Sequence, residues 1–252
     1  MEKIYTAMGL MSGTSGDGVD ASVISSDGIS DYNEVINKYF KYDQKMYENL
    51  HNLRSKIIKF DDLKKNENEI NILEREITLF HAKIVNDILQ LTDRKIDFLG
   101  FHGQTIYHNA LEKISKQIGD GKLLSQLTKK TVIYNFRQND IENGGEGAPL
   151  APLFHSLIVK KKKIELPVCI LNIGGIANVT LISQYDENNL LSRDLGPGNC
   201  LIDEWIRSNS NFKFDENGKI AKSGKIDQLI LNQAIDNFNI ESYSKSLDVK
   251  EF

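Results

Sequence analysis

Cysteine, proline and tryptophan are scarce in this sequence, and basic residues do not outnumber acidic ones. The 252 residues include 2 Cys, 4 Pro and 1 Trp. Two cysteines cannot build a disulfide framework, so their small number favours a reducing compartment. The 31 Lys and Arg against 35 Asp and Glu give a net charge of −4, which argues against a protein that coats nucleic acid.

Long hydrophobic runs are missing as well. No segment approaches the roughly 18 consecutive apolar residues that a membrane-spanning helix needs. The first residues lack the basic-then-apolar pattern of a secretion signal. We therefore expect a cytoplasmic protein with neither a membrane nor a nucleic acid as partner. With 40% hydrophobic and 26% charged residues, the composition is that of a globular protein with one large or two small domains.

The first half of the chain alternates short apolar runs with turns and contains one long amphipathic segment. Apolar residues recur every three or four positions between 61 and 91, which predicts a helix packed on a sheet. Strands are predicted over residues 4–11, 19–25, 35–42, 96–101 and 132–135.

The second half repeats the strand, glycine turn and strand pattern of the first. Strands are predicted over 168–172, 177–182 and 190–194, and helices over 153–159, 200–208 and 224–238. Cys169 lies in an apolar run and is expected in the core. The repeated pattern indicates an α/β protein of two related parts facing a cleft, with domains over residues 1–133 and 134–252.

A glycine- and hydroxyl-rich turn follows the first strand. Its residues are Gly13, Thr14, Ser15, Gly16, Asp17 and Gly18, and Val19 and Asp20 come next. Glycines let backbone N–H groups approach a ligand, and Ser and Thr add donors, a combination that suits phosphate oxygens. Asp17 or Asp20 could hold Mg²⁺ through water. The alternative is a hairpin tip with a purely structural purpose.

Two further polar groups lie beside glycine turns. Arg137 and Asp140 precede the run Gly144–Pro149, and a guanidinium beside such a loop suits a polar or anionic substrate. A surface loop with an ordinary salt bridge is the alternative. Asp194 ends a predicted strand just before a glycine turn that opens a helix. That position suits a general base or a metal ligand, and a helix-capping acid is the alternative.

Taken together, these segments resemble the anhydro-N-acetylmuramic acid kinases. The matching segments, which occur in the family's order, are Gly9–Asp20, Phe101–Thr105, Phe136–Asp140, Gly144–Pro149, Leu171–Asn178 and Asp194–Asn199. The resemblance implies the two-domain, ribonuclease H-like fold of actin, Hsp70 and the sugar kinases. Since family members continue beyond the last residue here, it also implies that the second domain is incomplete in this chain.

The activity that the resemblance implies uses ATP and Mg²⁺. Such an enzyme opens the 1,6-anhydro bridge of anhydro-N-acetylmuramate with water and phosphorylates the freed O6, giving N-acetylmuramate 6-phosphate in peptidoglycan recycling. By the same resemblance, residues 13–20 are the ATP phosphate loop and Asp194 is the catalytic base. The positions that match the sugar site are His102, Gln104, Thr105, Arg137, Asp140, Gly145, Pro149, Gly196 and Asn199. A homodimer is expected of a complete family member.

Several positions depart from the family pattern. Gly16, Glu146 and Leu195 stand where Leu, Gln and Thr are usual, and Lys245–Phe252 keeps only part of a Lys-Ser-Thr-Gly-Arg-Glu motif. These departures leave a second hypothesis open, a non-catalytic truncated remnant that binds a sugar or a protein partner.

Overall fold

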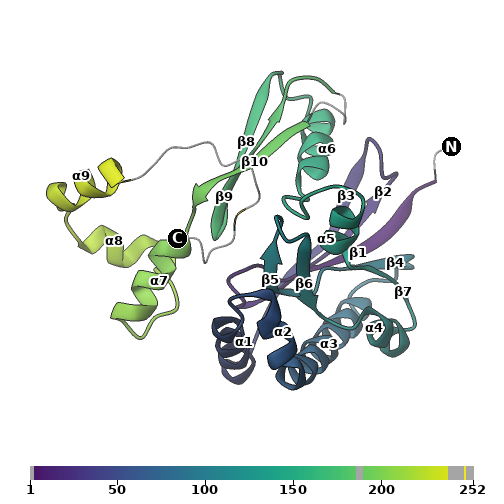
Figure 1. Cartoon of the computed structure of the whole chain (residues 1–252). Coiled ribbons are helices and arrows are strands. Elements are labelled where there is room, and N and C mark those ends of the chain that lie inside the picture. Colours follow the sequence, from purple (N-terminus) through teal and green to yellow (C-terminus); the bar gives the residue numbers. More distant parts are fainter. Residues whose placement is uncertain (1–2, 186–189, 238–246, 248–252) are drawn as a thin grey trace.

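The larger sheet of the computed structural model, which describes residues 3–185, 190–237 and 247, is built from the first half of the chain (Figure 1). Its strands lie in the order β3-β2-β1-β4-β7. They are β1 (Tyr5–Met11), β2 (Gly18–Ser26), β3 (Tyr32–Lys41), β4 (Phe98–Phe101) and β7 (Thr131–Tyr134). Strands β1, β2 and β3 are antiparallel, whereas β4 is parallel to both β1 and β7. All of the strands predicted in this half are confirmed.

Helices lie against one face of this sheet. They are α1 (Gln44–Lys56), α2 (Phe60–Lys65), α3 (Glu67–Leu89) and α4 (Gly121–Thr128), and Figure 1 shows them below the strands. The core forms between the two layers, where apolar side chains such as Met8 and Leu99 of the sheet and Leu50, Ile77 and Ile84 of the helices are fully buried. Burial of this apolar surface is the main force that holds the layers together.

The prediction of one continuous helix over 61–91 is wrong, because two helices, α2 and α3, occupy this segment. Asn66, with φ −104° and ψ 16°, separates α2 from α3. The preceding helix α1 was not predicted at all. Its signals are the Asp43 carboxylate, which caps the Met46 N–H at 2.8 Å, and buried residues spaced by three, Tyr47, Leu50 and Leu53.

Two further elements of this region were not predicted from the sequence. Gln104 begins strand β5 (Gln104–Asn109), which pairs with β6 (Ile114–Ile118). The polar segment after β7 begins with a helix, α5 (Phe136–Glu142).

The second half contains a smaller sheet and several helices. Its strands, in the order β10-β9-β8, are β8 (Val168–Ile173), β9 (Ile176–Ile182) and β10 (Leu190–Pro197), as predicted. The helices are α6 (Pro152–Lys162), α7 (Cys200–Asn209), the 3₁₀ turn Glu216–Gly218, α8 (Lys219–Ser223) and α9 (Gln228–Asn237). Cys169 is exposed, so its predicted core position is wrong. Its strand β8 lies at the edge of the sheet, while α6 packs against β9 and β10.

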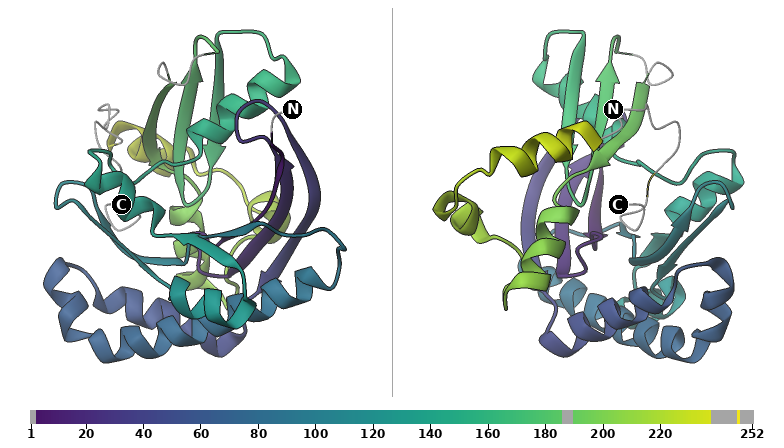
Figure 2. Two further views of the ribbon diagram at one scale, coloured as in Figure 1. Left: turned by 90° about the vertical axis from the view of Figure 1, so that its right-hand side faces the viewer. Right: turned by 60° about the vertical axis from the view of Figure 1, so that its left-hand side comes forward.

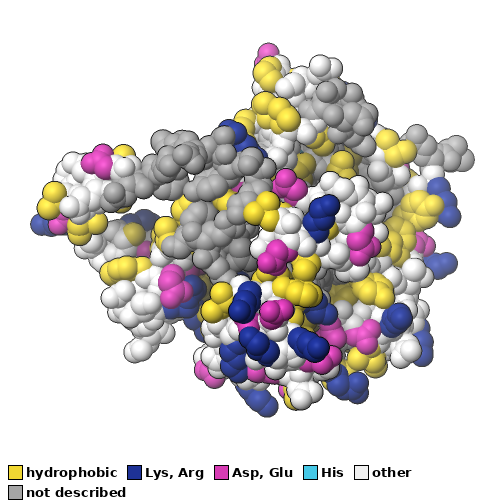
Figure 3. Space-filling model, in the orientation of Figure 1, with side chains coloured by type: hydrophobic (Ala, Val, Ile, Leu, Met, Phe, Trp, Pro, Cys, Tyr) yellow, Lys and Arg dark blue, Asp and Glu magenta, His cyan; other side chains and the backbone are white. Residues whose placement is uncertain are grey.

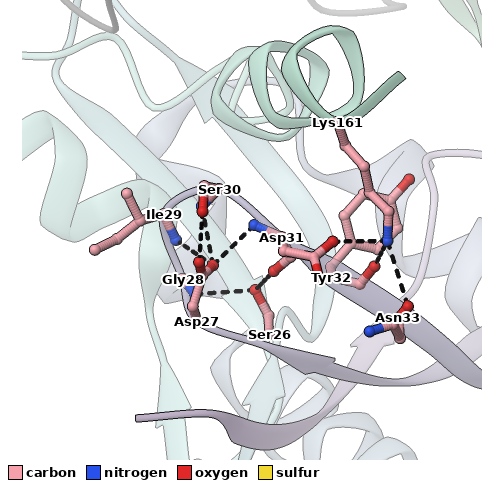
Figure 4. Close-up of polar contacts among 9 residues, drawn as sticks. All are labelled: Ser26, Asp27, Gly28, Ile29, Ser30, Asp31, Tyr32, Asn33 and Lys161. Atoms are coloured by element: carbon pink, nitrogen blue, oxygen red, sulfur yellow. Dashed lines mark hydrogen bonds and ion pairs between the residues drawn. The ribbon is translucent and has the colours of Figure 1, made fainter. Parts of the chain in front are cut away.

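Helix α6 connects the two sheets (Figure 2). On one side it packs against the smaller sheet, and on the other its Lys161 reaches the hairpin between β2 and β3 (Figure 4). The Lys161 ammonium lies 2.9 Å from the Asp31 carboxylate and 4.5 Å from the centre of the Tyr32 ring, and it donates to the Tyr32 carbonyl. The hairpin tip that it meets is preformed, because the Asp27 carboxylate accepts the N–H groups of residues 29–31, each at 2.9 Å.

These sheets and helices confirm the α/β fold class. The larger sheet ends before residue 135 and the smaller one begins at residue 168, while the domain boundary at 133 stays a prediction.

No helix in the described part of the chain combines the length and hydrophobicity of a membrane span. On the face in Figure 3, basic side chains over the lower helices are interspersed with acidic ones. Of the departing segment Lys245–Phe252, all but Leu247 lies outside the described residues.

Candidate active site

The first part of the site is the β1–β2 loop (residues 12–17), which joins two central antiparallel strands. Gly16 has a φ of 63°, and a Cβ built there would lie only 2.8 Å from the Leu50 Cδ2 atom of α1. Because other residues seldom adopt this backbone conformation and would also collide with Leu50, glycine suits this position. The loop therefore packs closely against α1.

Most carbonyl groups of the β1–β2 loop are bound by the rest of the protein. The Gly13 carbonyl accepts hydrogen bonds from Gly16 N (3.1 Å) and from Gln104 Nε2 (2.9 Å). The Thr14 carbonyl accepts from Arg54 Nη1, and the Ser15 carbonyl accepts from His51 Nε2 (3.0 Å). The Asp17 carbonyl accepts from Tyr42 N (2.9 Å). Arg54 and His51 both come from α1. The loop is thus held from several directions through its oxygen atoms.

This arrangement leaves N–H groups of the loop available for an anion. In a planar trans peptide, the N–H points away from the carbonyl of the preceding residue. Since the Gly13 and Thr14 carbonyls face their protein partners, the N–H groups of Thr14 and Ser15 face the other way. Neither N–H has an acceptor among the described residues. Consecutive outward N–H groups of this kind bind phosphate oxygens.

Two carboxylates lie at the end of the loop. Asp17 accepts hydrogen bonds from the hydroxyls of Ser15 and Tyr39. Burial and the negative charge of Asp17 raise the pKa of Asp20, and burial together with Asp17 raises that of Tyr39. The described residues contain no group of three metal-binding side chains. A pair of oxygen ligands still fits Mg²⁺, which keeps much of its coordination shell as water or phosphate oxygens.

The second part of the site is built on α5, where Arg137 and Asp140 lie one turn apart. Arg137 donates through Nε to His102 Nε2 at 2.8 Å and through Nη1 to Gly147 O at 2.7 Å, and Asp140 Oδ2 accepts from Gly147 N at 2.8 Å. A Cβ at Gly145 would overlap the Asp140 carboxylate. The glycine run therefore folds tightly around both side chains of α5.

Both ring nitrogens of His102 are used within the protein. Nδ1 lies 2.7 Å from the Gly103 carbonyl, which can only accept, so Nδ1 carries the proton and Nε2 accepts from Arg137. Burial, assisted by the Arg137 charge, lowers the pKa of His102 to about 4. At neutral pH the ring is therefore uncharged and suited to accept a hydrogen bond from a guanidinium.

The third part of the site is Asp194 on β10, whose register shifts just after this residue. Asp194 is 5% exposed, and its Oδ2 atom accepts from the Leu247 N–H at 2.8 Å. Burial lowers the pKa of Arg137, and the negative charges of Asp194 and Asp140 counter that effect. Asp194 and Asp140 thus each act electrostatically on Arg137, although Asp194 belongs to β10 and the other two residues belong to α5.

The other residues that the sequence predicts for the site lie on several different elements. Thr105 Oγ1 accepts from Gln117 Nε2 at 3.2 Å, and Asn199 Nδ2 donates to Ile173 O at 3.4 Å. Val19 is fully buried in the core, so a ligand could meet only its backbone. Gly18 opens β2, Gly196 lies in β10, and Pro149 follows the glycine run.

Sequence reasoning missed several residues that support the site. His51 and Arg54 lie in the helix that was not predicted, and only its capping and spacing signals could have revealed them. Tyr42 was assigned to a strand without a further role. Leu247 contacts Asp194 from 53 positions away, and no local signal points to such a contact.

Comparison with known proteins gives one consistent family. The family model described as anhydro-N-acetylmuramic acid kinase matches residues 5–247. The anhydro-N-acetylmuramic acid kinase of Pelagibacter ubique (strain HTCC1062) is 60% identical over 254 residues, covering 100% of this chain and 68% of that protein. The protein of that name from Rhizobium etli is 35% identical over 257 residues, with 100% and 69% covered.

One solved structure that matches this chain has much lower similarity. The ethanolamine utilization protein EutJ from Carboxydothermus hydrogenoformans matches 94% of this chain and 73% of that chain, with 9% identity and a TM-score of 0.39. A likeness of that size carries no argument about this protein.

Proposed function

The chain belongs to the anhydro-N-acetylmuramic acid kinase family, and on that premise we propose how its residues carry out an ATP-dependent phosphorylation of this sugar in peptidoglycan recycling. The observation that carries the proposal is a pair of contacts made where the chain passes from β4 into β5. His102 binds Arg137, while Gln104, two residues later and the first residue of β5, binds the Gly13 carbonyl of the β1–β2 loop. One short segment thereby connects the candidate sugar site to the candidate phosphate site.

The reaction needs a base on the sugar side. In the proposed step, the oxygen of a water molecule bonds to the anomeric carbon while Asp194 takes the proton. The bond from that carbon to O6 breaks, and O6 keeps the electron pair. O6 then attacks the γ-phosphorus, and ADP leaves. General base catalysis requires a positioned carboxylate, and the Leu247 N–H orients that of Asp194.

Arg137 is the proposed binding group for the polar sugar. Its Nε and Nη1 groups are held by His102 and Gly147, and its Nη2 group has no hydrogen-bond partner among the described residues, so Nη2 can donate to a substrate. A guanidinium whose position is fixed in this way loses little entropy on binding, so it orients the sugar at small cost. Asp140 adds an acceptor that suits sugar hydroxyls.

The β1–β2 loop is the proposed site for the phosphates of ATP. The N–H groups of Thr14 and Ser15 offset negative charge on the phosphate oxygens. Asp17 and Asp20 would hold Mg²⁺ through water, and the ion would neutralise charge on the phosphates. A homodimer and a cytoplasmic location remain predictions from the sequence.

The test is an assay of the purified chain with anhydro-N-acetylmuramate, ATP and Mg²⁺, run in water enriched in ¹⁸O. We expect N-acetylmuramate 6-phosphate and ADP in equal amounts, with the label on the anomeric carbon and none bridging O6 and phosphorus. Asp194→Asn, which keeps the shape but removes the base, should lower kcat by about 10²- to 10⁴-fold.

A matched control is Asp236→Asn in α9, whose carboxylate belongs to no part of the site. If the wild-type chain gives no product at any enzyme concentration, the non-catalytic remnant is the correct alternative. Near-normal turnover in the Asp194 variant would instead refute its role as the base.

A further inference from the structure

A chain of polar groups runs through the core beneath the β1–β2 loop. The Tyr42 hydroxyl lies 3.0 Å from Ser12 Oγ, and His81 Nε2 lies 3.4 Å from the same atom. The three residues are 2%, 1% and 0% exposed, respectively. Ser12 directly follows β1, Tyr42 directly follows β3, and His81 belongs to α3, so the chain joins the sheet to the helix layer.

In the two hydrogen bonds that link Tyr42, Ser12 and His81, the donor and acceptor roles are fixed. His81 Nδ1 lies 2.8 Å from the Ile77 carbonyl and must donate to it, so Nε2 is the acceptor. Ser12 therefore donates its proton to His81, and the Tyr42 hydroxyl donates to Ser12. Burial lowers the pKa of His81 to about 4 and raises that of Tyr42 to about 12, so both groups stay neutral near pH 7.

Tyr42 contacts the loop at both of its ends. Its hydroxyl holds the side chain of Ser12, the first residue of the loop, and its backbone N–H donates to the carbonyl of Asp17, the last, at 2.9 Å. The next carbonyl after Ser12, that of Gly13, receives both Gly16 N and Gln104 Nε2. Tyr42 therefore fixes the base of the loop whose N–H groups face outward.

The hydrogen bonds of His81 explain why a polar ring occupies this position in the core. Its ring packs against Phe101, with 4.9 Å between the ring centres, and is wholly shielded from water. Burial of a polar ring is costly unless its polar atoms are paired, and an apolar side chain would fill the same space without that cost. Two hydrogen bonds offset this cost: Nδ1 is paired with the Ile77 carbonyl and Nε2 with the Ser12 hydroxyl.

We propose that Tyr42, Ser12 and His81 are positioning residues that set the conformation of the β1–β2 loop and thereby its affinity for the phosphates of a nucleotide. This inference rests on the proposed function of the loop. The three side chains lie beneath the loop, so they act through its backbone.

The test compares Tyr42→Phe and Ser12→Ala, singly and together, with Tyr107→Phe as the control. Tyr107 is a buried tyrosine of β5 whose hydroxyl bonds Glu112 instead of the loop. Binding of a non-hydrolysable ATP analogue with Mg²⁺, and separately of the sugar, is measured by calorimetry. Circular dichroism confirms that each variant is folded at the temperature used.

We expect each single variant to bind the nucleotide about 2- to 10-fold more weakly, the fold-change that corresponds to one lost hydrogen bond. Sugar affinity should be unchanged. The double variant should lose less than the product of the two single losses, because both remove the same bond. The Tyr107 control should bind both ligands like the wild type.

Unchanged nucleotide affinity in folded Tyr42→Phe would overturn the inference while leaving the proposed function intact. An equal loss of sugar affinity would also overturn it, because a general loss of packing would then explain the result. If the wild-type chain itself does not bind the nucleotide, the proposed function of the loop is wrong and this inference falls with it.

Discussion

Replacement of His102 by leucine tests the positioning of Arg137 most directly. The change removes the acceptor of the 2.8 Å bond from Arg137 Nε and puts an apolar side chain in this partly buried place. Arg137 would keep its bond to Gly147 but could swing about it. The lost bond involves a charged donor, for which the net contribution is about 1.5–3 kcal/mol.

If that energy is used to orient Arg137 for the sugar, the KM for the sugar should rise by about 10- to 150-fold. The KM for ATP should change little, because the β1–β2 loop, the proposed phosphate site, is anchored by other residues. Steady-state kinetics with each substrate varied in turn separates the two constants. His102→Gln, whose amide oxygen reaches a similar position, should restore most of the sugar affinity.

Two results would refute this reasoning. An unchanged KM for the sugar in His102→Leu would mean that Arg137 needs no partner at Nε. Equal defects in the leucine and glutamine variants would mean that the imidazole itself contacts the sugar, as the resemblance implies, and is not merely an acceptor for Arg137.

Further predictions concern acid stability and the glycine run. His81 and His102 have a pKa near 4 in the folded chain against about 6.5 when unfolded, so the unfolded chain binds more protons in that range. The free energy of unfolding should therefore fall as the pH is lowered from about 6.5 to 4, measured by urea titration at several pH values. Replacement of His81 by Gln should flatten that dependence, and an equally steep fall in the variant would contradict the assignment. Gly145→Ala forces a methyl group against the Asp140 carboxylate, so it should raise the KM for the sugar at unchanged KM for ATP, measured by steady-state kinetics with each substrate varied in turn. An unchanged KM for the sugar would contradict the role given to Asp140.

Local patterns predicted the strands of the five-stranded and three-stranded sheets and the helices α3, α6, α7 and α9, but not the hairpin β5–β6 or the helices α1, α4, α5 and α8. Alternation and turn residues located β1, β2 and the β1–β2 loop within a residue or two, because the hairpin depends on neighbours in sequence. They failed for α1, where Tyr47, Leu50 and Leu53 stand among polar residues and the apolar face is narrow. They also failed at Asn66, since one residue that breaks a helix does not interrupt the apolar spacing on either side.

The candidate site was predicted in part for the same reason. Its residues stand out because they cluster around glycines, as Arg137 and Asp140 do beside residues 144–149. Their support could not be predicted, because it comes from tertiary contacts between distant segments. Tyr42 and His81 look like ordinary core residues until the fold brings them to Ser12, and Cys169 looked buried until the strand order placed it at an edge.

The contact between Leu247 and Asp194 has a consequence for the order in which the site forms during synthesis. Among the described residues, the side chains that bind the β1–β2 loop come from the first 104 positions, whereas Asp194 is oriented by Leu247. At about 5–20 residues per second on the ribosome, the chain from residue 104 to residue 247 takes roughly 7–30 s to add. The β1–β2 loop can therefore be complete on a nascent chain that does not yet hold Asp194 in place.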